Sequence, residues 1–248
     1  MIRRDASFDE LVTEAEEAPV DGWGFAWLDG RATEERPRWG YARVIARRMA
    51  GVAAALDLQT GGGEVLAEIP RRPRFLVATE SWAPNLAIAR RHLPIVVAAA
   101  NAGPLPFRDS CFPLVLSRHP VVTPWDEIGR VLTPGGTFLS QQIGAGSNRD
   151  LTEALMGPQP VAAGRSTDRA TSAAEAAGLE IVDLRTATLR VEFHDVGAIV
   201  WFLRKVVWTI PDFTVDRYRS RLRDLHEQIL EDGPFVSHAH RFLIEARK

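Results

Sequence analysis

Cysteine is nearly absent from this chain of 248 residues. The single thiol, Cys111, excludes a disulfide framework and a metal site built from cysteines. Its position where a strand should begin favours a core residue over a reactive one. No apolar run reaches the roughly 18 residues that a membrane helix needs. The stretch Met1–Glu10 has acidic residues and no hydrophobic segment, so we do not expect it to be a signal peptide. These absences predict a cytoplasmic protein.

An excess of charge of one sign is also missing. The chain has 30 Lys and Arg against 32 Asp and Glu, a net charge of −2. No overall field therefore favours nucleic acid or an anionic membrane. The arginine clusters at 71–74 and 217–223 are predicted to be mainly solvated faces. With 46% hydrophobic and 25% charged residues, the length suits one α/β domain with additions.

The most informative stretch is Ala53–Gly63. A short apolar run ends at Asp57, three glycines follow at Gly61–Gly63, and helix-favouring residues begin at Glu64. This order predicts a buried strand, a tight turn and a helix N-terminus. The open end of a parallel strand is where α/β sheets bind ligands. The dinucleotide fingerprint G-x-G-x-x-G is absent, which disfavours a nicotinamide dehydrogenase.

A second acid ends the next predicted strand, Arg74–Glu80. Glu80 lies 23 positions after Asp57. An acid at this place can accept hydrogen bonds from the hydroxyls of a ribose. Ser81 and Trp82 follow directly, and Trp82 could flank an adenine. The structural alternative for Glu80 is a helix cap or an ordinary loop acid.

These segments resemble the class I S-adenosylmethionine (SAM)-dependent methyltransferases. Asp57, Gly61 and Gly63 match the family motif acid-x-Gly-x-Gly-x-Gly, with Gln59 in place of the first glycine. The stretch Asn101–Asp109 resembles the family segment Asp-Ala-x-x-Leu-Pro-Phe-x-Asp, with Asn101 in place of the acid. Further matches lie in the turn Arg130–Gly136 and in two segments typical of uncharacterised bacterial, methyltransferase type 11-like members, His194–Val200 and Ile210–Phe213.

The resemblance implies a particular fold and division of the chain. The expected fold is α/β, with a doubly wound, Rossmann-like, seven-stranded and mostly parallel sheet, an antiparallel last strand and a helical insertion near the C-terminus. Residues 41–193 and 234–248 would form the SAM-binding domain. Residues 1–40, rich in aromatics such as Trp23, would form a cap that either packs on the domain or closes over a ligand. Residues 194–233 would be an inserted helical cover or a packing appendage.

The resemblance also implies SAM as the cofactor and no metal. The expected cofactor-binding residues are Asp57, Gln59, Gly61, Gly63, Glu80, Ser81, Trp82, Asn101, Ala102 and Arg118. The chemistry would be in-line displacement at the sulfonium methyl, for which the protein mainly supplies alignment. If the acceptor must lose a proton, His119 or His194 could serve as the base. His119 could equally be a satisfied loop histidine.

Two functions remain open. The first is transfer of a methyl group to a small-molecule acceptor, with neither nucleic acid nor membrane favoured and the oligomeric state open. The second is a degenerate methyltransferase fold that binds SAM or another ligand as a regulatory or scaffold module. The departures at Gln59 and Asn101 keep this second function in view.

Overall fold

A computed structural model describes residues 5–20, 24–101, 103–161 and 163–248. Trp23 of the expected cap, Ala102 of the expected cofactor site and residues 1–4 of the N-terminus lie outside the described residues. The chain divides into two compact units. The first comprises Met1–Arg36, Gly146–Ala162 and Thr188–His240, and the second comprises Pro37–Ala145, Ala163–Ala187 and Arg241–Lys248.

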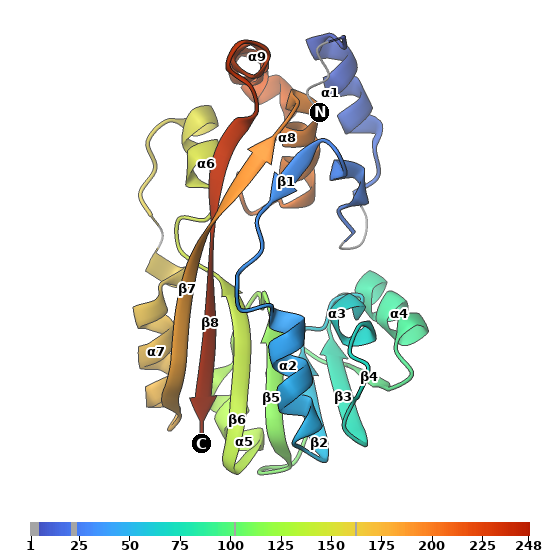
Figure 1. Cartoon of the computed structure of the whole chain (residues 1–248), viewed down its shortest axis with the longest axis vertical. Helices are drawn as coiled ribbons and strands as arrows, with labels where there is room; N and C mark the ends of the chain where they lie inside the picture. The colour runs from blue at the N-terminus through green and yellow to red at the C-terminus, as the bar shows by residue number, and fades with distance from the viewer. Residues whose placement is uncertain (1–4, 21–23, 102, 162) are drawn as a thin grey trace. The chain divides into compact units, whose positions relative to one another are not determined.

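Strands and helices alternate through most of the chain (Figure 1). The strands are β1 (Ala32–Glu34), β2 (Ala54–Leu58), β3 (Phe75–Glu80), β4 (Val96–Ala99), β5 (Phe112–Arg118), β6 (Leu132–Ile143), β7 (Glu180–Phe193) and β8 (Phe235–Arg247). The helices are α1 (Phe8–Glu17), α2 (Tyr41–Ala50), α3 (Glu64–Ala67), α4 (Ala83–His92), α5 (Trp125–Val131), α6 (Arg149–Met156), α7 (Thr167–Ala176), α8 (Val196–Lys205) and α9 (Val215–Asp232), with 3₁₀ turns η1 (Ala26–Leu28) and η2 (Ala163–Arg165).

The sheet of the second unit has the order β7-β8-β6-β5-β2-β3-β4. The neighbours from β6 to β4 pair in parallel, whereas β8 pairs antiparallel with β6. This arrangement confirms the predicted fold class. Strand order reverses between β2 and β5, which leaves a switch point at the carboxyl ends of these strands, where open α/β sheets bind ligands.

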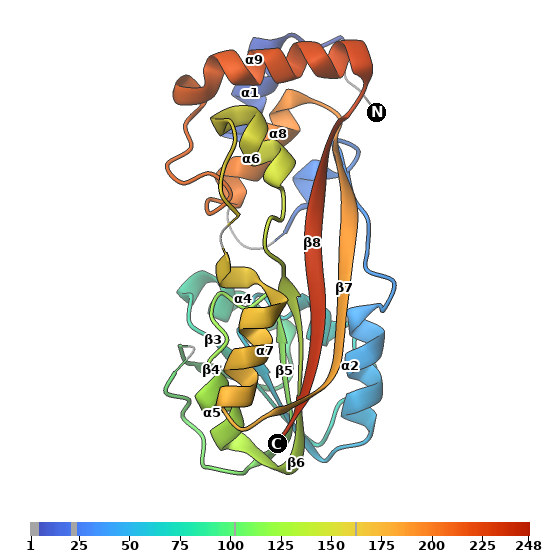
Figure 2. The same ribbon diagram turned by 90° about the vertical axis from the view of Figure 1, so that its left-hand side faces the viewer.

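Two apolar layers cover the sheet because successive strand residues point to opposite faces. Ala55 of β2 belongs to the layer that includes α2, α3 and α4, whereas its neighbour Leu56 belongs to the layer with α5 and α7. Figure 2 shows α2 and α7 on opposite sides of the strands. Both layers contain residues with no exposed surface, and the central strands β2 and β5 are buried on both faces.

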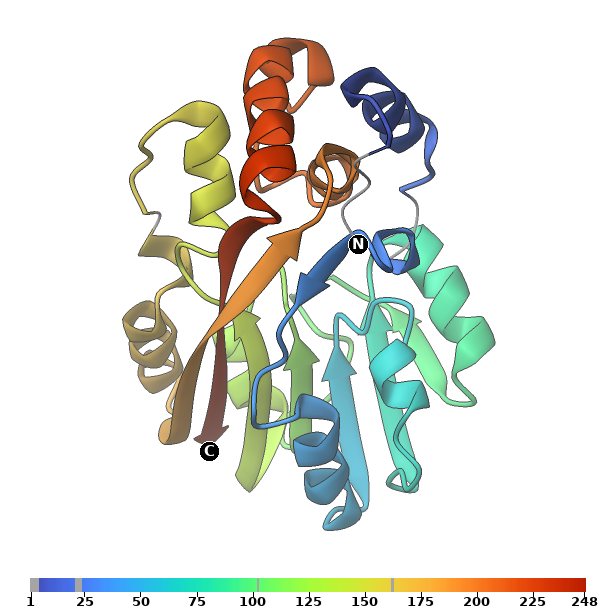
Figure 3. The same cartoon turned by 45° about the horizontal axis from the view of Figure 1, so that its top comes forward.

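The first unit is mainly helical. Helix α8 lies between α1 and α9 in Figure 3, and residues along nearly its whole length are buried. Ser7 followed by Glu10 three residues later is a capping-box signature, and this capping box starts α1. Thr214 caps α9, and the expected helical segment 194–233 contains the two helices α8 and α9. None of the helices in the described ranges is both long and apolar enough to cross a bilayer.

Several details differ from the sequence-based expectations. An eighth strand, β1, pairs antiparallel with β7 in the first unit. The glycine- and proline-rich composition of residues 144–164 predicts a loop, but α6 forms inside this stretch. The turn residues Pro134–Gly136 lie within β6, whose irregular start accommodates Gly135 at a φ of 73°. The predicted core residue Cys111 is exposed. Helical spacing of apolar residues from Val196 to Val207 predicts one buried helix face. Val207 is nevertheless exposed, because α8 ends at Lys205.

Candidate cofactor and active site

Asp57 and Glu80 stand at the carboxyl ends of the neighbouring strands β2 and β3. Asp57 is in register with Ala78, and Glu80 lies two residues beyond Ala78 on the same strand. Partners in register, and residues two apart along a strand, share one face of the sheet. Both carboxyl groups therefore belong to the same face and the same edge of the sheet, beside the switch point.

Asp57 is a buried acid, with 7% of its surface exposed. Burial raises the pKa of the Asp57 carboxyl to about 7, against an opposing effect of the Thr60 side chain. No cationic side chain of the described residues contributes to this pKa. The nearby Tyr41 hydroxyl donates to the carbonyl of Ser117 at 3.0 Å. Burial, and then the Asp57 carboxylate, hold the pKa of Tyr41 well above its usual value.

The Glu80 carboxylate ties the glycine turn to the end of β3. Its Oε2 accepts from the backbone N–H of Gly61 at 2.9 Å, and its Oε1 accepts from the N–H groups of Ser81 and Trp82, both at 2.8 Å. Glu80 is buried, while the side chains of Ser81 and Trp82 are exposed. A carboxylate can accept about four hydrogen bonds. One acceptor site on Oε2 therefore remains for a ligand hydroxyl.

The turn between β2 and α3 requires glycine at two positions. Gly61 and Gly63 have φ values of 65° and 82°, in the left-handed region that residues with a Cβ rarely adopt. A Cβ on Gly63 would also lie 2.6 Å from Cδ1 of Leu93. The predicted glycine motif thus has a physical basis in backbone conformation and in close packing.

Gln59, which replaces a family glycine, bridges two loops. Its Nε2 donates to the carbonyl of Val122 at 2.6 Å, and its Oε1 accepts from the N–H of Val121 at 2.8 Å. Its φ is 55°, so the residue keeps the left-handed conformation that glycine would adopt. The substitution therefore fastens the loop after β5 to the turn after β2. Sequence reasoning missed this bridge because the partners are backbone groups about 60 residues away.

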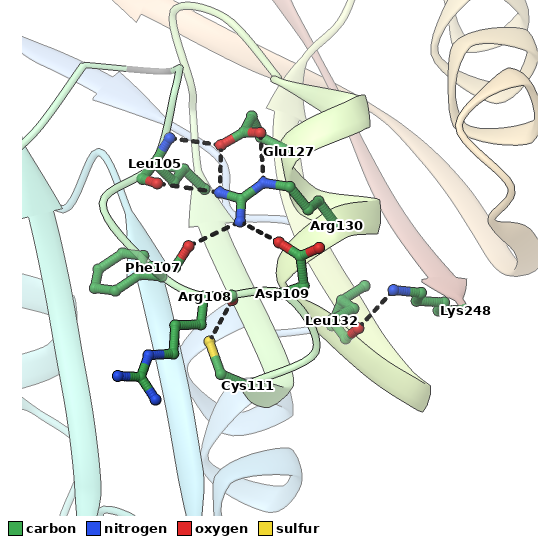
Figure 4. A network of polar contacts seen from close by, with 9 residues as sticks. All are labelled: Leu105, Phe107, Arg108, Asp109, Cys111, Glu127, Arg130, Leu132 and Lys248. Atoms are coloured by element: carbon green, nitrogen blue, oxygen red, sulfur yellow. Dashed lines mark hydrogen bonds and ion pairs between the residues drawn. The ribbon is translucent and has the colours of Figure 1, made fainter.

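The segment Leu105–Asp109 is held by one arginine of α5 (Figure 4). The Arg130 guanidinium donates to the carbonyls of Leu105 and Phe107 and to the carboxylate of Asp109, at 2.7–3.1 Å. It also forms a two-pronged ion pair with Glu127, both bonds 2.7 Å long, and Glu127 accepts from the N–H of Leu105. The Arg130 hydrogen bonds lower the pKa of Glu127 to about 2. The segment Leu105–Asp109 and the turn that begins at Arg130, which match the family separately, are therefore joined by hydrogen bonds.

The expected cofactor-binding residues Asn101 and Ala102 lie just before this segment. Asn101 is exposed after the end of β4, and Ala102 lies outside the described residues. Arg118 ends β5 and is exposed.

His119 follows Arg118 with a φ of 52°, and its backbone N–H donates to the carbonyl of Gln141 at 2.7 Å. Burial, followed by the charges of Arg118, Arg241 and Arg165, holds the pKa of His119 well below its usual value.

The second candidate base, His194, belongs to the first unit. Its backbone N–H donates to the carbonyl of Arg31 at 2.8 Å, and burial lowers its pKa. The other described candidates all belong to the second unit, where the backbone N–H of Gly61 donates to Glu80 and that of Gln59 donates to the hydroxyl of Thr79, the residue before Glu80. The described residues contain no cluster of His, Cys, Asp and Glu suited to a metal ion.

The two carboxyl groups and the glycine turn fit the sulfonium nucleotide that the resemblance implies. A buried carboxyl without a cationic partner suits the ammonium of an amino-acid group, because pairing would offset the cost of its ionisation. The remaining acceptor site of Glu80 suits a hydroxyl, and the turn at Gly61 brings bare backbone beside both groups.

Comparison with protein families gives one match. Residues 56–140 match a family model described as a methyltransferase domain. That range contains every candidate cofactor residue from Asp57 to Arg118, and also His119. No curated protein matches the chain.

Solved structures share the fold at low sequence identity. BH2331 of Bacillus halodurans, solved as a candidate methyltransferase, has a TM-score of 0.57 and 20% identity over 82% of this chain and 98% of its own. YcgJ of Bacillus subtilis has a TM-score of 0.60 and 17% identity over 84% and 97%. SpnF, named as a [4+2]-cyclase, has a TM-score of 0.51 and 19% identity over 84% and 80%.

Proposed function

We propose that this chain, which belongs to the class I SAM-dependent methyltransferases, transfers a methyl group from SAM to a small-molecule acceptor. One observation carries the proposal. Asp57 and Glu80 share a face at the carboxyl ends of adjacent parallel strands, beside a turn whose Gly61 N–H is bonded to Glu80. Opposite ends of one elongated ligand can therefore meet two carboxyl groups across a short stretch of bare backbone.

The roles of individual residues follow from their surroundings. Asp57 binds the ammonium of the amino-acid part, Glu80 accepts a ribose hydroxyl at Oε2, and Trp82 packs beside the adenine. Gln59 fixes the loop after β5, and Arg118 is the last residue of β5 before this loop. When bound, SAM supplies a methyl group already activated on a sulfonium. The protein then contributes alignment of acceptor and methyl, which can provide on the order of 7–11 kcal/mol of the barrier.

Residues 194–233 are proposed to cover the acceptor, with residues 1–40 as an aromatic cap. The acceptor is proposed to be small because the near-zero net charge of −2 gives no general attraction to nucleic acid. The cytoplasmic location stays a prediction.

A second candidate function is ligand binding without methyl transfer. Gln59 and Asn101 depart from the family motifs, and SpnF is an example of a structural neighbour named for a different reaction. In this case the protein would bind SAM or another ligand as a regulatory or scaffold module.

Labelled SAM separates the two candidates. We expect purified protein to transfer a labelled methyl group into the small-molecule fraction of a metabolite extract. Glu80→Ala should lose SAM affinity by more than about 1 kcal/mol, the scale of a charge-assisted hydrogen bond. Glu68→Ala, at an exposed position after α3, is the matched control.

Binding without transfer would favour the second candidate, and label in nucleic acid or protein would contradict a small acceptor. Unchanged affinity in Glu80→Ala would remove Glu80 from the site.

A further inference from the structure

Three side chains of the second unit form a hydrogen-bonded row next to the candidate site. Trp39 precedes α2, Gln141 lies near the end of β6, and His119 follows β5. The Trp39 Nε1 donates to Oε1 of Gln141 at 2.7 Å, and Nε2 of Gln141 lies 3.0 Å from Nε2 of His119. Trp39 and Gln141 are both buried, so water does not compete freely for these groups.

The indole fixes the orientation of the amide. An indole N–H can only donate, so the atom of Gln141 that faces Trp39 must be its oxygen. The amide nitrogen, which can only donate, then faces His119. Its partner Nε2 of His119 must therefore accept, which means that this ring nitrogen carries no proton. The single proton of a neutral imidazole is thus assigned to Nδ1.

The charges around His119 also favour the neutral form of its ring. Arg118 at the end of β5, Arg241 on β8 and Arg165 in η2 lie close enough for their charges to disfavour a protonated ring. No carboxylate of the described residues acts on His119 in the opposite sense. Protonation would also place two N–H groups, those of Gln141 and His119, against each other. The ring is therefore held neutral by burial, by geometry and by charge.

The remaining N–H group of His119 is open to a ligand. Nδ1 has no hydrogen-bond partner among the described residues. It is also not among their fully buried side-chain atoms that lack a partner, so it keeps some accessible surface. Its surroundings are cationic, so the partner they favour is an oxygen that carries negative charge.

We propose that His119 acts in this site as a neutral Nδ1–H donor to an anionic oxygen of a bound ligand, a carboxylate or phosphate, and not as a general base. This inference rests on the proposed function. A base must hold a free lone pair toward the proton it removes, whereas the lone pair of His119 is already committed to Gln141. The anionic oxygen can belong to the amino-acid carboxylate of SAM or to the acceptor.

Nitrogen NMR of the imidazole rings tests the assignment in the intact protein. We expect His119 to show a protonated Nδ1 and an unprotonated Nε2, with no titration between pH 5.5 and 8. Gln141→Glu replaces the donor by an acceptor, so His119 should gain a proton on Nε2 and titrate about 1–3 pH units higher. Gln142→Glu, one residue along β6 on the other face, should leave His119 unchanged.

Protonation at Nε2 in the unmodified protein, or titration near pH 6.5, would overturn the neutral-donor role whether or not Gln141→Glu folds. Binding of S-adenosylhomocysteine, monitored by the shifts of other resonances in the same spectra, tests the proposed function separately.

Three probes locate the anion. A change at His119 Nδ1 with S-adenosylhomocysteine but not with 5′-methylthioadenosine, which lacks the amino-acid part, would assign the SAM carboxylate. A change only with acetate or inorganic phosphate, added to the S-adenosylhomocysteine complex, would assign the acceptor. No change with any probe would overturn the anion partner.

Discussion

At the scale of single residues, the buried carboxyl of Asp57 makes folding stability depend on pH. Its carboxyl has a pKa of about 7 in the folded protein and an ordinary value near 3.8 when unfolded. Between these two values the folded state binds more protons than the unfolded state. The free energy of unfolding therefore falls as pH rises from about 4 to about 7. The ligand-free protein carries this cost because no described cation offsets it.

Asp57→Asn removes the ionisable group and keeps its shape. We expect the variant to be more stable than the unmodified protein at pH 8, by on the order of 1–4 kcal/mol, with a much smaller gain at pH 5. Urea unfolding at the two pH values measures this difference. Asp126→Asn, at an exposed position of α5, is the matched control. Equal gains at both pH values would show that ionisation of Asp57 is not the cause.

At the scale of elements, Arg130 joins α5 to the segment that leads from β4 to β5. One planar guanidinium meets two carbonyls and two carboxylates of Leu105, Phe107, Asp109 and Glu127, a geometry that an ammonium cannot reproduce. The segment contains no helix or strand of its own, so these bonds account for much of its order.

Arg130→Lys keeps the positive charge and removes the planar guanidinium with its several N–H donors. We expect faster amide hydrogen exchange at 105–109 and a loss of S-adenosylhomocysteine affinity of roughly tenfold, because Asn101, a proposed cofactor residue, lies just before this segment and would lose its support. Arg169→Lys, at an exposed position of α7, controls for the chemical change. Unchanged exchange at 105–109 would show that the segment is ordered by other contacts.

The sequence predicts the elements of the second unit well because their signals are local. The apolar run before Asp57 and the glycines after it identify β2 and its turn. The stretch Tyr41–Ala50 predicts a short basic helix, and α2 has these bounds. Prediction from the sequence fails where an element depends on partners that are distant along the chain. The short strand β1 exists through pairing with β7, and α6 has a mixed composition inside a glycine-rich stretch.

The same distinction holds for the candidate site. Glycine spacing and the acids that end two apolar runs are enough to single out Asp57 and Glu80 from the sequence. The bridge made by Gln59 and the row from Trp39 through Gln141 to His119 join residues that are far apart in the sequence, with no motif of their own. These contacts follow from strand order, which a single sequence specifies only indirectly.

At the scale of the whole molecule, the chain divides into two compact units. The first unit packs α1, α8 and α9 around residues such as Val200, whose surface is completely buried. All described candidate cofactor residues belong to the second unit. Disruption of the first unit should therefore leave cofactor binding in place.

Val200→Asp tests this separation by burying a charge in α8. We expect it to destabilise the first unit by several kcal/mol while S-adenosylhomocysteine still binds. Val207→Asp introduces the same charge at a position that is 59% exposed, and should change neither property. Hydrogen exchange resolved by segment, combined with a binding titration, measures both. Loss of binding in Val200→Asp alone would show that the cofactor site depends on the first unit.

The most direct measurement is a calorimetric titration of the protein with S-adenosylhomocysteine at pH 6 and pH 8. Pairing of the ligand ammonium with an Asp57 carboxyl whose pKa is about 7 predicts saturable binding that is tighter at pH 8. The pH dependence should disappear in Asp57→Asn. An absence of binding heat at high protein concentration, or equal affinity at both pH values, would contradict the account.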